Sequence, residues 1–197
     1  MSADNREVAE VSESLRGIAS RLFAEIGYDG TTIDMLISAG ASRQEVAAAG
    51  GKSGLYRAVM EDLLKRRCRA LEAVLADASP GLEGFSRLAD AFLDFNLENP
   101  TASALWTHRS LHDAADFSDL ESRFIAPVAR MMIDNDHGRT LPTAPEMQLA
   151  TIGWCVMGFL TRGLFNADGS TSGAEDPDTV SRFREHLHQL IRFMNTP

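Results

Sequence analysis

Hydrophobic positions recur along almost the whole chain at three- and four-residue steps, the spacing of an amphipathic helix. The first such segment begins at Val8 and ends near Gly27, and no segment alternates as a half-buried strand would. Two short segments follow, over about 33–37 and 44–46, and then a long one over about 53–78. The pattern predicts an all-α protein.

Five further helices are predicted in the second part of the chain, separated by turn-forming glycine, proline and acidic residues. Their expected ranges are 82–97, 101–114, 118–134, 144–166 and 177–194. The apolar run over 149–165 is short for a bilayer crossing and carries Arg162 near its end. It is more typical of a buried helix, so we expect about nine helices and no membrane span.

The two short helices have the order and turn of a helix-turn-helix motif. The turn Ser38-Ala39-Gly40-Ala41-Ser42 is built of small residues, which let two short helices cross closely. Ser42 is placed to cap the second helix, the one that enters the major groove in such motifs. The expected organisation is a three-helix domain over 1–52, a connecting helix over 53–78 and a larger helical bundle over 79–197.

Charge divides the chain into two parts. The chain has 197 residues, with 28 acidic and 19 basic side chains and a net charge of −9. Residues 1–70 hold ten of each sign, so the whole excess lies in 71–197 and argues against a protein that coats nucleic acid. The basic run over 65–69 is expected to be solvated or paired with the acidic second part.

The localisation expected from the sequence is cytoplasmic. Cys68 and Cys155 lie far apart and match no metal-ligand spacing, so neither a disulfide framework nor a zinc site is indicated. The first residues show no basic segment followed by an apolar run, the pattern of a signal peptide.

The stretch LFAEIGYDGTTIDMLISAGASRQEV, followed by GGKSGLYRAV, resembles the N-terminal domain of the TetR (tetracycline repressor) family of bacterial transcription regulators. The motif similarity spans about residues 10–65. The matching positions are Leu22, Phe23, Ala24, Glu25, Gly27, Tyr28, Thr31, Thr32, Ala39, Gly40, Ser42, Lys52, Leu55, Ala58 and Val59. The resemblance implies a homodimeric regulator, expected to be a repressor, that binds a palindromic operator in double-stranded DNA and is released by a small apolar effector.

The chain departs from the family pattern at the end of the second short helix. Residues 46–51 read Val-Ala-Ala-Ala-Gly-Gly where the family has a Tyr that contacts the DNA backbone and a Phe that anchors the helix. Losing a buried Phe costs about 3–5 kcal/mol if nothing fills its space. Three alternatives stay open: altered DNA binding, a degenerate dimer that no longer binds DNA, or an alanine run that is not the natural sequence.

If the motif binds DNA, seven residues are the candidates for contact. Arg43 can bind guanine and Gln44 adenine in a bidentate manner, and Glu45 can accept a hydrogen bond from cytosine. The phosphate candidates are Thr31, Thr32, Ser42 and Lys52. Alternatively, the threonines and Ser42 are only helix caps, and Arg43 and Gln44 are ordinary surface residues.

The second part of the chain is rich in Met and aromatic residues, which suit an adaptable apolar pocket as well as a plain core. The helices near 144–166 and 177–194 are expected to form the homodimer face. Arg162 could anchor an anionic ligand or extend to the surface. The candidate pocket residues are Trp106, Phe124, Met131, Trp154, Met157 and Arg162.

Enzyme and metal functions have little support in the sequence. His108, His112 and Asp116 could share one helical face towards a metal, but no fourth ligand is apparent. No glycine-rich phosphate loop or catalytic triad motif is present, so neither catalysis nor a cofactor is predicted. The rival function is a degenerate TetR-like dimer that acts as a ligand-binding or protein-interaction module.

Overall fold

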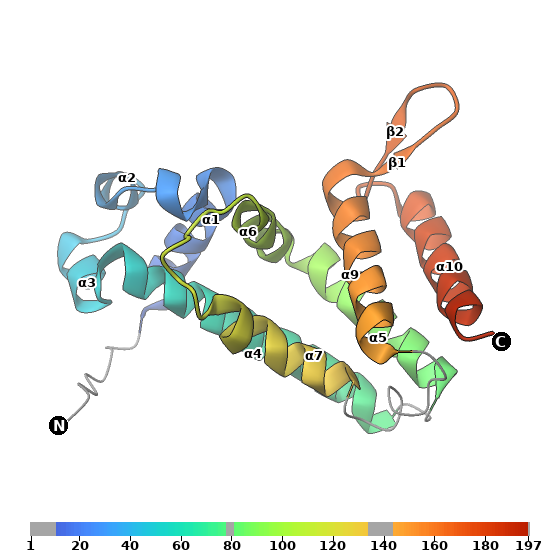
Figure 1. Ribbon diagram of the computed structural model, residues 1–197. Helices are drawn as coiled ribbons and strands as arrows, with labels where there is room; N and C mark the ends of the chain where they lie inside the picture. Colours follow the sequence, from blue (N-terminus) through green and yellow to red (C-terminus); the bar gives the residue numbers. More distant parts are fainter. Residues whose placement is uncertain (1–10, 78–80, 134–143, 197) are drawn as a thin grey trace. The chain divides into compact units, whose positions relative to one another are not determined.

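The computed structural model describes residues 11–77, 81–133 and 144–196 (Figure 1). The all-α prediction is confirmed: these residues form nine α-helices, one π-helical turn and one two-stranded hairpin. The expected helix start at Val8 and the expected turn over 136–138 lie outside the described residues. None of the described helices is long and apolar enough to cross a membrane.

The first four helices are α1 (Glu13–Gly30), α2 (Ile33–Ser38), α3 (Arg43–Ala48) and α4 (Gly51–Asp77). Helix α1 begins where the Ser12 hydroxyl accepts a hydrogen bond from the Leu15 amide at 3.3 Å. Gly27 has φ of +77° and Gly50 of +83°, values that favour glycine and interrupt the helical geometry. Gly40, with φ of +108°, lies between α2 and α3, and Gly50 lies between α3 and α4, so the predicted order of one long and two short helices is confirmed.

The middle of the chain forms α5 (Leu82–Glu98), α6 (Pro100–Ser110), the π-helical turn η1 (Glu121–Ile125) and α7 (Ala126–Ile133). The prediction of one helix over 101–114 was wrong, because α6 ends at Ser110 and the backbone then turns through positive φ at His112 and Ala114. The Arg109 guanidinium stabilises this turn by donating hydrogen bonds to the carbonyl oxygens of Asp113 and Ala114. His112 and Asp116 therefore do not share a helical face with His108.

The last part of the chain forms α9 (Pro145–Arg162), the strands β1 (Leu164–Phe165) and β2 (Thr171–Ser172), and α10 (Pro177–Met194). The expected helix over 144–166 was too long, and the prediction that no strand would form was wrong. Gly163 ends α9 with φ of +67°, and a Cβ there would lie 2.6 Å from the Ser172 carbonyl oxygen. The chain thus turns at Gly163 into a short antiparallel hairpin before α10.

The chain divides into two compact units. The N-terminal unit comprises residues 1–64 and 104–118, and the C-terminal unit comprises 65–103 and 119–197. Helices α4 and α6 therefore contribute residues to both units. Residues 104–118 lie with the N-terminal helices, although the sequence grouped them with the rest of 79–197.

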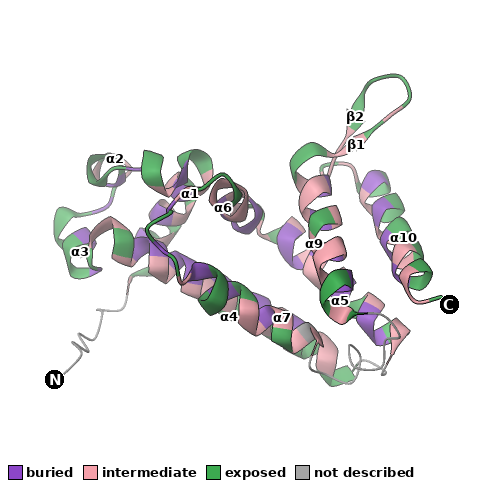
Figure 2. Ribbon diagram, viewed as in Figure 1, coloured by how far each residue is buried: buried purple, intermediate pink, exposed green. Residues whose placement is uncertain are grey.

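The core of the C-terminal unit lies where α5, α9 and α10 contact one another, and Figure 2 shows buried stretches on α5 and α10. Phe159 of α9 stacks on Phe183 of α10, with ring centroids 4.1 Å apart. The buried cluster consists of Phe85, Ala89, Leu93, Ile152, Val156, Phe159, Phe183, Leu187 and Ile191. Burial of these side chains is the main force that holds the three helices together.

Candidate functional site

Helix α3 is held by its buried side, and its other side is exposed. Leu36 of α2 and Val46 and Ala49 at the end of α3 are buried. Ala49 lies near the place where the family pattern has its anchoring Phe, and a buried alanine supplies less contact area there. The exposed residues of α3 are Arg43, Gln44, Glu45, Ala47 and Ala48.

Two of the predicted phosphate contacts are helix caps. The Thr32 hydroxyl accepts from the Met35 amide at 3.2 Å, and the Ser42 hydroxyl accepts from the Glu45 amide at 3.0 Å. Both residues are exposed. A hydroxyl that accepts one hydrogen bond still has its own proton to donate, so the capping role leaves each able to bind a phosphate oxygen.

The other two predicted phosphate contacts are directed towards the end of α1. Thr31 is 1% exposed and donates its hydroxyl proton to the Gly27 carbonyl oxygen at 2.6 Å. The Lys52 ammonium donates to the Tyr28 carbonyl oxygen at 2.9 Å and lies 4.1 Å from the centre of the Tyr28 ring. Both side chains stabilise the C-terminal end of α1 in this structure.

Arg43 forms an ion pair with Asp34 of α2, with an N–O distance of 3.2 Å. Both side chains are largely exposed, and such surface pairs contribute roughly 0–1 kcal/mol. Arg43 can therefore leave Asp34 for a stronger partner at little cost. Gln44 and Glu45 are exposed beside it.

An aromatic cluster in the N-terminal unit joins α1, α4 and the segment after α6. Phe23 and Tyr28 of α1, Tyr56 of α4 and Phe117 pack with ring centroids between 4.9 and 5.9 Å apart. Burial, followed by the charges of Asp29 and other nearby carboxylates, raises the pKa of Tyr28. Phe117 was missed by the sequence analysis because it stands in a break between two helices.

The turn after α6 is bound to the end of α1 through Asp113. Its carboxylate accepts from the amides of Tyr28 and Asp29 at 2.7 and 2.8 Å. The Asp29 carboxylate in turn accepts from the Ala114 amide at 3.3 Å, and a His108 ring nitrogen lies 3.0 Å from the Ala24 carbonyl oxygen. No local sequence signal marks Asp113, since the residues it joins are more than 80 positions apart.

The expected pocket residues do not share one environment. Phe124 is buried, whereas Met131 and Met157 are half-buried in the C-terminal unit. Trp106 is half-buried and belongs to the N-terminal unit. The candidates therefore differ in burial and are divided between the two units.

Two more of the candidates are exposed on α9. Trp154 is 68% exposed, and Arg162 lies at the exposed C-terminal end of the helix. Met147, seven residues before Trp154 and so on the same face, is 62% exposed, and Phe193 near the end of α10 is 84% exposed. Large apolar side chains thus stand in solvent on both helices expected to form a dimer.

A groove in the C-terminal unit lies instead along α4 and α5. Its volume is about 380 Å³, and none of the expected pocket residues lines it. Its lining residues are Ala70, Val74, Arg87, Asp90, Ala91, Asp94, Phe95 and Glu98.

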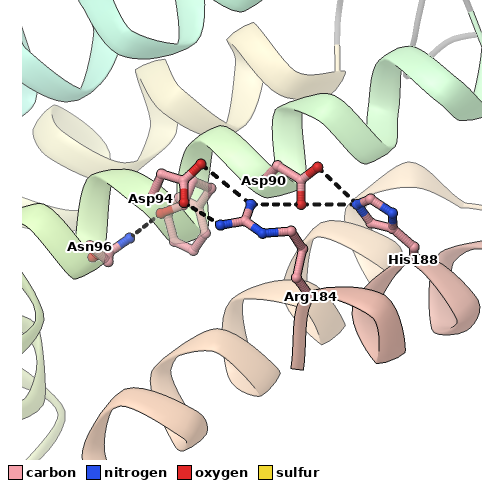
Figure 3. A network of polar contacts seen from close by, with 6 residues as sticks. Asp90, Asp94, Asn96, Arg184 and His188 are labelled. Carbon is pink, nitrogen blue, oxygen red and sulfur yellow. Dashed lines mark hydrogen bonds and ion pairs between the residues drawn. The ribbon is translucent and has the colours of Figure 1, made fainter. Parts of the chain in front are cut away.

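Two of the groove carboxylates are tied to α10 by a polar network (Figure 3). Arg184 binds Asp94 and lies 3.0 Å from Asp90. The His188 Nε2 lies 2.8 Å from the other Asp90 oxygen. The hydrogen bond that Arg184 donates to Asp94 is the main reason that the pKa of Arg184 is raised.

The basic run over 65–69 contains one exception to the expected solvation. Lys65, Arg66 and Arg69 are exposed, as predicted, but Arg67 is only 7% exposed. Helical spacing does place Arg67 on the buried face of α4, four residues after Leu63 and four before Leu71, but its charge led the sequence analysis to treat it as solvated with the rest of the run.

The chain matches no protein-family model, and no curated protein matches it significantly.

Proposed function

We propose that the protein is a ligand-responsive transcriptional regulator, expected to act as a cytoplasmic repressor, that binds a palindromic operator as a homodimer. The observation that carries the proposal is α3, whose first turn presents Arg43 and Gln44 to solvent while Val46 and Ala49 hold its other side. The resemblance of residues 22–59 to the TetR motif supports the same function. A small effector would release the DNA.

Operator recognition would depend mainly on the first turn of α3. Arg43 would exchange its exposed pair with Asp34 for a guanine, and Gln44 would bind an adenine. Each bidentate contact of this kind favours the matching base over a wrong base by about 1–3 kcal/mol. Thr32 and Ser42 would donate their hydroxyl protons to phosphates and fix the register of the helix.

Dimerisation would use the exposed apolar side chains of α9 and α10. Met147, Trp154 and Phe193 are large and exposed, and a second copy would cover them. A two-fold dimer can read two half-sites about 34–36 Å apart, which explains a palindromic operator.

The effector would act by preferring one of two arrangements of the protein. Helix α6 contributes to both units, and the turn that follows it is bound to α1 through Asp113. A ligand that shifts α6 in the C-terminal unit would therefore change the constraints on the helices that carry the motif.

The deciding experiment is a selection from fragmented genomic DNA, followed by affinity measurements at several salt concentrations. We expect enrichment of one palindrome and an affinity whose logarithm falls linearly with the logarithm of the salt concentration, because releasing counterions from the DNA is less favourable at higher salt. Arg43→Ala should weaken binding about 5- to 150-fold for each half-site through the lost base contact. Arg130→Ala, at an exposed cation on α7 away from the proposed dimer face, is the matched control and should leave binding unchanged.

A specific observation favours the second candidate, a dimer that has lost DNA binding and serves as a ligand-binding or interaction module. The N-terminal unit holds seven basic against twelve acidic side chains, a net charge of −5. Four of the ten basic residues in 1–70 lie at 65–69 and so belong to the C-terminal unit, which leaves the N-terminal unit acidic. This second function is supported if the wild type enriches no DNA and a variant that carries the family's Tyr and Phe at the end of the recognition helix does.

A further inference from the structure

Arg67 is a buried cation with no anionic partner in the described structure. It lies on α4 in the C-terminal unit and is 7% exposed. Its Nε is buried and makes no hydrogen bond with any residue that the structure describes. The contacts of the guanidinium are two aromatic rings of α5: its carbon lies 5.8 Å from the centre of Phe92 and 5.3 Å from that of Phe95.

The two aromatic rings compensate only part of the free energy that burial of the Arg67 charge costs. Burial lowers the pKa of Arg67 to about 10, so the side chain is still protonated at neutral pH. A ring face attracts a cation, but it leaves the in-plane N–H groups without acceptors. A buried charge of this kind normally has an anionic partner that accepts its hydrogen bonds.

Two acidic side chains of α5 that line the groove are bound elsewhere. Asp90 and Asp94 form ion pairs with Arg184, and Asp90 also binds His188 (Figure 3). Neither carboxylate forms an ion pair with Arg67.

The groove along α4 and α5 adjoins this cation. Phe95 lines the groove and also lies under the Arg67 guanidinium, which is not itself part of the lining, so a ligand would reach Arg67 past the edge of this ring. Ala70 and Val74, which line it too, follow Arg67 by three and seven residues and so occupy the same face of α4. With a volume of about 380 Å³, the groove offers room for a small apolar body beside the buried charge.

We propose that Arg67 binds the carboxylate of a small organic monoanion whose apolar body lies against Phe95 in the groove. The carboxylate would accept hydrogen bonds from Nε and a terminal nitrogen of the guanidinium, the planar geometry that arginine favours. A second cation, Arg87, also lines the groove and donates to the Asp77 carbonyl oxygen, whereas the carboxylates of Asp90, Asp94 and Glu98 along the groove disfavour more than one negative charge on the ligand. The inference rests on the proposed function only in calling this ligand the effector.

The proposal replaces the role that the sequence suggested for Arg162. That residue is exposed at the end of α9, where water already solvates its charge. A desolvated guanidinium gains more from a carboxylate than a solvated one, so Arg67 is the stronger anion site.

The test compares carboxylates with their neutral alcohols on the full-length protein. Butyrate, octanoate and benzoate are each titrated beside butanol, octanol and benzyl alcohol, with binding followed by calorimetry and thermal unfolding. We expect the wild type to prefer at least one carboxylate over its alcohol. Arg67→Met should weaken that carboxylate about 10- to 100-fold and leave the alcohol unchanged, because only the charged hydrogen bonds are lost.

Arg69→Met is the matched control, since Arg69 is an exposed cation two residues away on the same helix. It should bind the carboxylate as the wild type does. The proposal is overturned if the wild type shows no preference for any carboxylate, if Arg67→Met keeps that preference, or if Arg69→Met loses it equally.

Two further results keep the test decisive. If circular dichroism shows that Arg67→Met does not fold, Arg67→Lys decides: a weakened preference supports the planar contact, and an unchanged one overturns it. The binding assay contains no DNA, so carboxylate binding without operator binding would overturn the regulator function alone. Operator binding without a carboxylate preference would overturn only the inference about Arg67.

Discussion

At the scale of single residues, the sequence identified side chains whose role depends on their immediate neighbours. The caps at Thr32 and Ser42 bond amides three residues ahead, which their position in the chain already implies. Asp113, Phe117 and Arg67 could not be identified in this way. Each acquires its role from residues at least 25 positions away, and nothing local in the sequence marks that partner.

Asp113→Ala should destabilise the N-terminal unit by about 1–3 kcal/mol. The substitution leaves the amides of Tyr28 and Asp29 without the carboxylate that accepts from both, and lost charged hydrogen bonds have this magnitude. Urea unfolding, followed by circular dichroism, measures the change. Asp116→Ala, at an exposed position in the same turn, should change stability by less than about 0.5 kcal/mol. Equal effects of the two substitutions would contradict the assigned role.

At the scale of elements, periodicity identified the helices better than it located their ends. It predicted α5 and α10 within a residue, because a continuous apolar stripe and a proline or glycine mark each boundary. It extended α6 and α9 too far. The segment after Ser110 still contains helix-compatible residues, and the hydrogen bonds that Arg109 donates hold the turn there. Helix α9 ends at Gly163, whose positive φ is a local stop signal that the apolar periodicity passes over.

Gly163→Ala should destabilise the protein by about 1–3 kcal/mol, because the residue has φ of +67° and a Cβ would collide with the backbone oxygen of Ser172. Gly17→Ala should do the opposite and stabilise it by about 0.5–1 kcal/mol. Gly17 is exposed within α1, and nothing lies within 4 Å of the position its Cβ would take. Thermal and urea unfolding of both variants provide the comparison. A stabilised Gly163→Ala variant would refute the strained turn.

At the scale of the whole molecule, the two units differ from the divisions that the sequence suggested. Residues 104–118 join the N-terminal helices, and the basic run at 65–69 joins the C-terminal unit. The unit that carries the helix-turn-helix is therefore acidic, and any DNA contact would depend on a few exposed cations rather than on a general positive field.

The proposed homodimer has a mass of about twice 21.5 kDa and should dissociate when its apolar face is charged. Trp154→Lys and Phe193→Lys each place a cation where the partner would cover an exposed aromatic side chain. Sedimentation velocity should then report the single-chain mass for both variants. Leu111→Lys, at a 75% exposed apolar position of the N-terminal unit, is the control and should remain dimeric. A wild type that sediments as a monomer would refute the dimer.

The sequence by itself determined the helical class, the order of the helices and the capped helix-turn-helix. These depend on residues three or four positions apart and on glycines whose backbone preference is local. The tertiary structure decided the rest. It packed Phe117 into the aromatic cluster, bound Asp113 to α1, buried Arg67 on two rings and left Trp154 in solvent. Those features depend on contacts between distant segments, and a spacing rule within one helix contains no information about which distant segment will lie against it.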